Sequence, residues 1–281
     1  MNKSHSGCFY RMWLGDSVTT GPSVRHPPLL LLHGLSGTSW DWIRTVLRML
    51  HMERTVVAMD LPGYGYSSWI GESERYSVEL WAKAVGNFAT EIFGSDPFVL
   101  VGHSLGGKIA LQVAAEGAHN VERMLLVDSG PSLGRGHVGE HAFPTIAAAL
   151  SAYRPRYEKE AEDVYLVRME DYLEKIQSGV RIRRDPRIAT EYVNGDIGDE
   201  QEKLWNIWEN LRLPLYVIRG GASKVLSPER LAEMLARNEM ASRTEIAGSG
   251  HNIPSEAPEA LAVLMSRILH SHRVPCRETG P

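Results

Sequence analysis

Residues 98–107 read Phe-Val-Leu-Val-Gly-His-Ser-Leu-Gly-Gly, an apolar run that ends abruptly in a glycine-rich turn. The run Phe98–Val101 is typical of a strand that is covered on both faces of a sheet. From Leu105 onward the apolar residues recur with a helical period. Ser104 lies at the junction, in a Gly-x-Ser-x-Gly string whose glycines leave room for the strand and helix beside a sharp turn. Such a turn lifts the serine hydroxyl out of the sheet and exposes it for chemistry.

The same alternation of short apolar runs and helical patterns extends along the chain. The predicted strands are Phe9–Leu14, Leu29–Leu32, Thr55–Met59, Phe98–Val101, Met124–Val127, Leu215–Ile218 and Thr244–Ile246. The predicted helices are Val78–Phe93, Leu105–Glu116, Pro228–Met240 and Pro258–His270. Continuously apolar strands that alternate with amphipathic helices predict an α/β fold with a mostly parallel sheet, in which Phe9–Leu14 forms an antiparallel edge strand.

The alternation stops between Ser132 and Leu213, where we find no strand-like run. Helices are predicted there around Thr145–Tyr153, Tyr157–Gln177 and Glu200–Leu211. We therefore predict one domain whose core comprises residues 1–131 and 214–270, with residues 132–213 inserted as a helical lid. Residues 271–281 carry no periodicity and are expected to form a flexible tail.

Composition excludes several classes of protein. The 281 residues are 43% hydrophobic, and a net charge of -4 gives no electrostatic reason to expect nucleic acid or an anionic membrane as a partner. The two cysteines, Cys8 and Cys276, form neither a disulfide framework nor a Cys-x-x-Cys metal pair. The first nine residues lack the apolar segment of a secretory signal, and the run Leu29–Leu32 is too short to cross a bilayer. We expect a cytoplasmic protein with a small-molecule substrate, whose oligomeric state the sequence leaves open.

Two further loops follow predicted strands and carry groups suited to acyl chemistry. His33-Gly34-Leu35-Ser36-Gly37 follows the first apolar strand, and its backbone is expected beside Ser104. The backbone N–H groups of Leu35 and Leu105 are predicted to hold the oxygen of a tetrahedral intermediate. His251 lies in a glycine-rich loop after the last predicted strand, where it can reach the serine hydroxyl as a general base.

These motifs resemble the α/β-hydrolase superfamily in type and in order, over nearly the whole chain. The Asp-Leu-Pro-Gly-Tyr-Gly turn at residues 60–65 adds to the resemblance. The resemblance implies an eight-stranded sheet, a lid before the last two strands, and a triad of serine, acid and histidine. In most members the acid follows the penultimate strand, but that position holds Lys224 here. Asp128, at the end of the strand Met124–Val127, is therefore predicted as the acid, an arrangement similar to (acetamidomethylene)succinate hydrolases.

Two remaining clusters bear on metal and substrate binding. His137-Val138-Gly139-Glu140-His141 spells an H-x-x-E-H zinc motif, but the nearby glycines favour a loop over the helix that such a motif requires, so no metal site is predicted. The predicted lid contains an arginine cluster: Arg181, Arg183, Arg184 and Arg187. Arg183, Arg184 and Trp205 are the candidates for substrate contact, with Arg suited to clamp a carboxylate.

The sequence predicts a serine hydrolase that cleaves a carboxylic ester through an acyl-enzyme intermediate and without a metal or organic cofactor. Ser104 is the predicted nucleophile, His251 the base, and Asp128 the acid that orients it. Two alternatives stay open: an amide, enamide or carbon–carbon bond hydrolase of the same fold, and a ligand-binding receptor that retains the triad.

Overall fold

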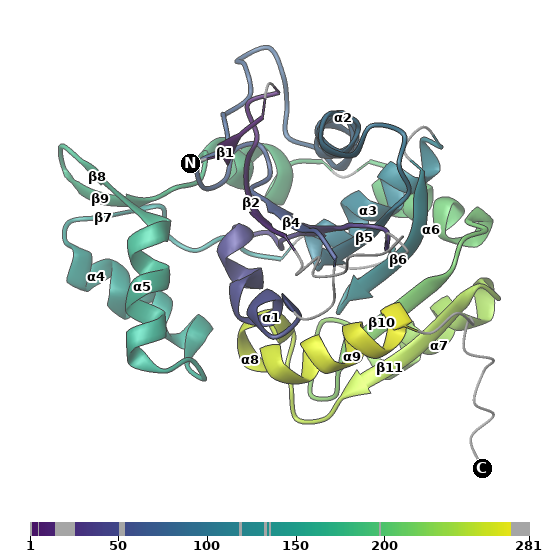
Figure 1. Ribbon diagram of the computed structural model, residues 1–281. Coiled ribbons are helices and arrows are strands. Elements are labelled where there is room, and N and C mark those ends of the chain that lie inside the picture. Colours follow the sequence, from purple (N-terminus) through teal and green to yellow (C-terminus); the bar gives the residue numbers. More distant parts are fainter. Residues whose placement is uncertain are drawn as a thin grey trace, which may run out of the picture.

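The computed structural model describes residues 2–4, 6–14, 26–50, 54–117, 120–131, 134, 136–196 and 198–270. An eight-stranded sheet has the order β1-β2-β4-β3-β5-β6-β10-β11 (Figure 1). Its strands are β1 (Asn2–Lys3), β2 (Phe9–Trp13), β3 (Leu29–Leu32), β4 (Val56–Met59), β5 (Phe98–His103), β6 (Val121–Val127), β10 (Leu215–Gly220) and β11 (Ala241–Ile246). The predicted mostly parallel, eight-stranded α/β sheet is confirmed.

Six strands, from β4 to β11 in this order, run parallel, and β2 pairs antiparallel with β4. The antiparallel β2 was predicted, but it is not the edge, because β1 pairs on its outer side. The parallel register aligns the strand ends: Leu32 lies beside Gly102, His103 beside Val127, and Val127 beside Ile218. The loops that follow β3, β5, β6 and β10 therefore begin at one edge of the sheet.

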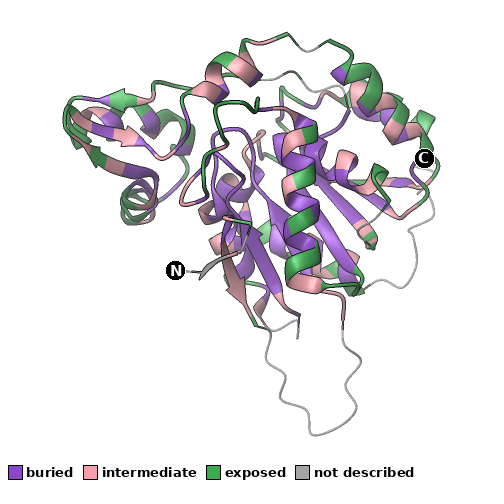
Figure 2. Cartoon of the chain, turned by 90° about the horizontal axis from the view of Figure 1, so that it is seen from above, coloured by how far each residue is buried: buried purple, intermediate pink, exposed green. Residues whose placement is uncertain are grey.

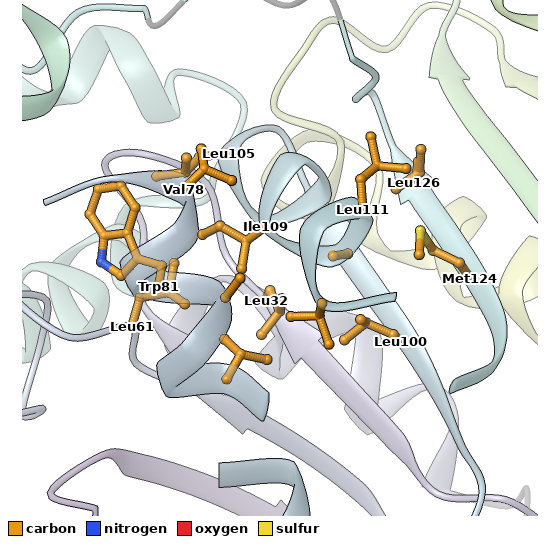
Figure 3. Close-up of a cluster of buried hydrophobic side chains, with 14 of the residues drawn as sticks. Leu32, Leu61, Val78, Trp81, Leu100, Leu105, Ile109, Leu111, Met124 and Leu126 are labelled. Carbon is orange, nitrogen blue, oxygen red and sulfur yellow. The ribbon is translucent and has the colours of Figure 1, made fainter. Parts of the chain in front are cut away.

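Alternate side chains of each strand enter opposite cores because successive residues of a strand point to opposite faces. On one face, Leu32, Leu100 and Leu126 pack under α2 (Val78–Phe93) and α3 (Leu105–Ala115), and Figure 3 shows Ile109 of α3 near Leu32. On the other face, the adjacent residues of the same strands, Leu31, Val101 and Val127, are buried against α1 (Ile43–Leu47) and α9 (Pro258–His270). Figure 2 shows the result, a sheet that is buried almost throughout. The sheet is thus a rigid base for the loops at its edge.

The helices are α1 (Ile43–Leu47), α2 (Val78–Phe93), α3 (Leu105–Ala115), α4 (Ile146–Tyr153), α5 (Glu162–Tyr172), α6 (Glu200–Asn210), α7 (Pro228–Arg237), α8 (Ile253–Glu256) and α9 (Pro258–His270). Several begin at a serine or threonine cap, such as Ser77, whose side chain accepts from the backbone N–H of Leu80. The bounds of α2 and α9 coincide with the predicted ones. α1 and α8 were not predicted, because helices of five and four residues are too short to show a period.

Between β6 and β10 the chain forms a second, smaller sheet of the order β7-β9-β8, which packs with α4 and α5 at one side of the molecule (Figure 1). Its strands are β7 (Ala142–Phe143), β8 (Leu173–Ile176) and β9 (Gly179–Ile182). We call residues 142–182 the insert. The prediction that this region contains only helices is therefore wrong, and so is the predicted helix across residues 173–177.

The hairpin was missed because its strands are short and carry charged residues on one face. In β9 only Val180 and Ile182 are buried, and they pack in the small core of the insert. α6, which was predicted as part of the lid, lies against α3, and its Trp208 belongs to the main core. The predicted domain boundaries stay predictions, and the predicted tail, residues 271–281, lies outside the described residues.

Candidate active site

Ser104 occupies the junction of β5 and α3 that the sequence indicated. Its backbone has φ 51°, a left-handed conformation that a residue other than glycine adopts only when its surroundings impose it. The flanking positions require glycine: a Cβ at Gly102 would lie 2.3 Å from the carbonyl oxygen of Gly106, and one at Gly106 would lie 2.5 Å from that of Leu32. The close approach of strand and helix thus forces the turn that presents the Ser104 side chain.

His251 links Ser104 to Asp128. Its Nε2 lies 3.0 Å from Ser104 Oγ, and its Nδ1 lies 2.7 Å from Asp128 Oδ2. The three residues come from three loops, after β5, β6 and β11, that the sheet brings to one edge. The structure therefore places all three predicted residues in one hydrogen-bonded chain, with the acid fully buried and the histidine partly exposed.

The Asp128 carboxylate is held from both sides. Oδ1 accepts the backbone N–H of Gly220 (2.9 Å), and Oδ2 accepts the Ser223 hydroxyl (2.6 Å) as well as the bond to His251. Because β6 and β10 pair with Val127 beside Ile218, the end of β10 and the turn after it lie beside Asp128. Lys224, at the position where the resemblance placed the usual acid, is exposed in this turn. Buried donors on each oxygen stabilise the charged form of the carboxylate and fix its orientation.

A second histidine supports the first. His103 is buried, and its Nε2 donates to the backbone carbonyl of His251 (2.9 Å), so it fixes the backbone of the loop that carries the base. Burial, and next the charge of His251, lower the pKa of His103 to about 4. His103 is therefore neutral near pH 7, and its ring holds its loop partner without adding charge beside His251.

The predicted oxyanion donors lie on either side of Ser104. Leu105 is the first residue of α3, so its N–H has no carbonyl four residues earlier in the helix to bond. Leu35 lies in the turn after β3, and a Cβ at Gly34 would lie 3.3 Å from Ser104 Cβ, which brings this turn against the serine. The helix N-terminus adds positive potential at the same point. The arrangement suits stabilisation of an oxygen anion.

The candidates for substrate contact separate into three environments. The Arg183 guanidinium is paired with Glu174 (3.3 Å). Trp205, on α6, lies under the guanidinium of Arg237, whose central carbon is 4.4 Å from its ring centroid. Arg184 is buried beside the loop after β3 and has no ion-pair partner among the described residues. Of these three candidates, Arg184 alone therefore has a charge that is available for a ligand.

The H-x-x-E-H stretch forms a loop, as its glycines predict. Residues 136–140 have no helix or strand, and His137 and Glu140 are exposed. Within the described part of the chain, no group of three His, Cys, Asp or Glu side chains is placed to hold a metal ion.

Sequence reasoning missed the residues that support the triad. No role was predicted for Ser223 or Gly220, and His103 was noted only as part of the motif around Ser104. A signal was present for Ser223, because it stands in the stretch where relatives carry their acid. Its bond to Asp128 follows only from the pairing of β6 with β10, which a single sequence does not reveal.

An open cavity of about 260 Å³ lies next to this site. Its walls are residues 155–160 of the insert on one side, and Ala222, Gly250 and the last two residues of α8, Ser255 and Glu256, on the other. Since Gly250 precedes His251, the cavity opens beside the base.

A fold of this topology, with a serine at the strand-to-helix turn and an acid-backed histidine, is that of the α/β-hydrolases. A sequence profile of the alpha/beta hydrolase family matches residues 29–264. The chain therefore belongs to this family, and the predicted resemblance is confirmed.

Known proteins are similar over most of their length. The esterase Rv0045c of Mycobacterium tuberculosis is 28% identical, covering 86% of this chain and 83% of its own. A 3-hydroxybutyrate-oligomer hydrolase of Cupriavidus necator is 25% identical, covering 84% and 86%. Among solved structures, an E-2-(acetamidomethylene)succinate hydrolase matches with a TM-score of 0.76 and 21% identity, over 87% of this chain and 92% of that one. At this identity the last similarity concerns the fold alone.

Proposed function

We propose that this protein is a serine hydrolase that cleaves a carboxylic ester of a small molecule through an acyl-enzyme intermediate. The observation that carries the proposal is the hydrogen-bonded chain from Ser104 Oγ through His251 to the buried Asp128. A serine hydroxyl is a weak nucleophile, and a base at 3.0 Å with a fixed acid behind it is the arrangement that activates it.

In the proposed reaction, Ser104 Oγ attacks the acyl carbon while His251 Nε2 takes its proton. The carbonyl oxygen becomes an anion that the N–H groups of Leu35 and Leu105 stabilise; one such donor is typically worth about 3 kcal/mol. The tetrahedral intermediate collapses, His251 returns the proton to the leaving alkoxide, and the alcohol departs. Water then attacks the acyl-enzyme with His251 again as base, which releases the carboxylic acid and restores Ser104.

Ester bonds are the favoured substrate class because full-length relatives are named an esterase and an oligomer hydrolase of 3-hydroxybutyrate. The same three residues can also serve amide, enamide or carbon–carbon bond cleavage. A panel that pairs an ester with the amide of the same acid separates these possibilities. Faster turnover of the ester supports the proposal, and turnover of the amide alone contradicts it.

We also infer that the insert acts as a lid, because it contacts the loop that carries the base. Lys159 donates to the backbone oxygen of Gly248 (3.3 Å) and to Glu256 (2.7 Å), on the two sides of His251 in the sequence.

Within the described ranges, no helix combines the length and the apolar character needed to cross a membrane. The cytoplasmic setting that the cysteine content favours stays a prediction.

Replacing Ser104 with Ala tests the proposal. We expect turnover of 4-nitrophenyl acetate to fall to background, because the hydroxyl serves the chemistry. The circular dichroism spectrum should stay unchanged, because the hydroxyl does not contribute to packing. A fluorophosphonate probe should label the wild type and not the variant. The matched control is Ser95→Ala, which lies before β5, at the opposite edge of the sheet. Full activity of Ser104→Ala, or labelling of both proteins, contradicts the proposal.

A further inference from the structure

A small cavity lies beside the loop that carries the predicted oxyanion donor Leu35. It is lined by Ser36, Gly37 and Thr38 of this loop and, from other elements, by Tyr64, Tyr172, Ile182, Arg183 and Arg184. Its volume of about 10 Å³ is room for a group the size of about one water molecule. The cavity therefore takes the end of a small polar group and excludes an acyl chain.

Arg184 enters this cavity with an unbalanced charge. Its side chain is buried, with 2% of the residue exposed. Nη2 donates to the backbone oxygen of Gly139 (3.1 Å), but Nε and Nη1 have no hydrogen-bond partner among the described residues. The adjacent Asp185 does not pair with it and instead accepts from the Tyr76 hydroxyl (2.9 Å) and the Arg187 backbone N–H (2.9 Å).

Two neutral donors around the cavity lack partners as well. Tyr64 Oη and Ser36 Oγ are buried, and the described residues offer no acceptor to either. Burial raises the pKa of Tyr64, so its hydroxyl keeps its proton near neutral pH. Burial, and then the charges of Arg184 and Arg181, lower the pKa of the neighbouring His141. The lowered pKa favours its neutral form, which does not balance the charge of Arg184.

Unpartnered buried donors are costly, and a buried charge without a counter-ion costs still more. A fold retains such a group where a ligand completes it, and the group required here is an anion that accepts several hydrogen bonds. The Nε and Nη1 edge of a guanidinium presents two N–H groups in the spacing of a carboxylate.

We propose that Arg184, Tyr64 and Ser36 form a subsite for a carboxylate of the substrate, which makes the preferred substrate an acidic ester. This inference rests on the proposed ester hydrolysis. Ser36 follows Leu35 directly, and adjacent Cα atoms are about 3.8 Å apart. The carboxylate therefore lies a few bonds from the carbonyl that Leu35 and Leu105 polarise, as in a half-ester of a short dicarboxylic acid.

The test compares the monoethyl esters of malonic, succinic and glutaric acids with neutral ethyl esters of the same shape, for example ethyl 4-methylpentanoate for monoethyl succinate. Hydrolysis is followed by pH-stat titration. We expect the wild type to prefer at least one acidic ester in kcat/KM. Arg184→Met should lower kcat/KM for that ester roughly 10- to 100-fold and leave the neutral ester unchanged, the scale of hydrogen bonds to a charged group.

Arg181→Met is the matched control, because Arg181 is partly exposed and already paired with Glu174. It should leave both rates unchanged. Urea unfolding adds a readout that separates binding from support of the fold: Arg184→Met should be as stable as the wild type or more stable, because it removes a buried unpaired charge.

Equal effects of Arg184→Met on acidic and neutral esters, or loss of stability with no change in preference, would overturn the subsite. A third result would also overturn it: a free dicarboxylate changes turnover of the neutral ester in the wild type but not in Arg184→Met, while the wild type shows no preference for acidic esters. These results leave fluorophosphonate labelling of Ser104 intact, whereas failure of the proposed hydrolysis removes the labelling too.

Discussion

Asp128 has its role because of where β6 ends. Its backbone has φ 45° and its N–H donates to the carbonyl of Ile218 (2.7 Å), so the chain turns at once and the carboxylate points along the edge toward His251. Ser223 and the Gly220 N–H then fix both oxygens.

Changing Asp128 to Asn should lower kcat by as much as ~10⁴, because an amide at Oδ2 no longer holds the His251 tautomer that leaves Nε2 unprotonated. The side chain keeps its volume, so the fold should persist. Steady-state kinetics on 4-nitrophenyl acetate measure the effect. Lys224→Ala, in the turn where most relatives carry the acid, is the control and should change kcat little. Near-normal kcat in Asp128→Asn contradicts the assignment.

His103 gives the fold a dependence on pH. An ordinary histidine has a pKa of about 6.5, whereas His103 has a pKa of about 4 in the folded protein. Below pH 6.5 the unfolded chain takes up a proton that the folded protein refuses, so stability falls as the pH falls from 6.5 to 4. The contribution of this one group is about 3 kcal/mol.

Urea unfolding of the wild type and of His103→Gln between pH 6.5 and 4.5 measures this contribution. Glutamine keeps an N–H for the His251 carbonyl and has no proton to gain. The free energy of unfolding of the variant should therefore fall less steeply with acid than that of the wild type, while groups common to both cancel. Parallel curves would show that His103 does not titrate as its burial implies.

At the scale of residues, the three members of the hydrogen-bonded chain were predictable because the proposed chemistry restricts both residue type and place. Ser104 is marked by its glycines and His251 by its loop, whereas Asp128 was predicted from the family resemblance, which places the usual acid at Lys224. The supporting residues were not predictable in the same way. Ser223, His103 and the unpaired state of Arg184 depend on which strands are neighbours and on which partners a side chain fails to meet.

At the scale of elements, the insert is joined to the core by a buried ion cluster. Arg168 of α5 donates to both carboxylate oxygens of Glu160 (2.9 and 2.5 Å), and it also reaches Asp41 of the core. Its Nη2 lies 3.2 Å from Ser255 Oγ, in α8. One guanidinium thus joins the insert to two elements around the active site.

Arg168→Met should lower the free energy of unfolding by about 3–5 kcal/mol, since it removes the ion-pair partner that the buried carboxylates of Asp41 and Glu160 share. The insert should also become sensitive to protease. Arg181→Met, which breaks a partly exposed pair with Glu174, should cost at most about 1 kcal/mol. Urea midpoints and limited proteolysis measure the two variants side by side. An Arg168→Met midpoint equal to that of Arg181→Met would show that the cluster adds nothing to stability.

Elements of the large sheet were predictable because a strand buried on both faces is apolar throughout and a long amphipathic helix shows its period. β3 and α2 were predicted residue for residue. The hairpin of β8 and β9 was not, because each strand has only four residues and contains charged side chains beside a helix. Short elements whose pairing is tertiary leave little local signal.

At the scale of the whole molecule, the parallel register is what makes a site. Loops that are distant in sequence, after β3, β5, β6, β10 and β11, start at one edge of a buried sheet, so groups 147 residues apart, such as Ser104 and His251, meet at 3.0 Å. The insert lies beside this edge (Figure 1) and contributes Arg184's neighbours and one wall of the larger cavity. In the proposed function, the sheet positions the reacting groups and the insert acts as the lid.

The central claim is that hydrolysis passes through an ester on Ser104, and trapping that ester tests it most directly. With 4-nitrophenyl acetate, an activated ester, acylation outpaces deacylation, and the acyl-enzyme accumulates. The reaction is stopped with acid before one turnover, digested, and mapped by mass spectrometry. We predict a burst of nitrophenolate close to one per chain and an acetyl group on Ser104. Turnover with no acetyl group on Ser104, or with the acetyl group on another residue, would contradict the account.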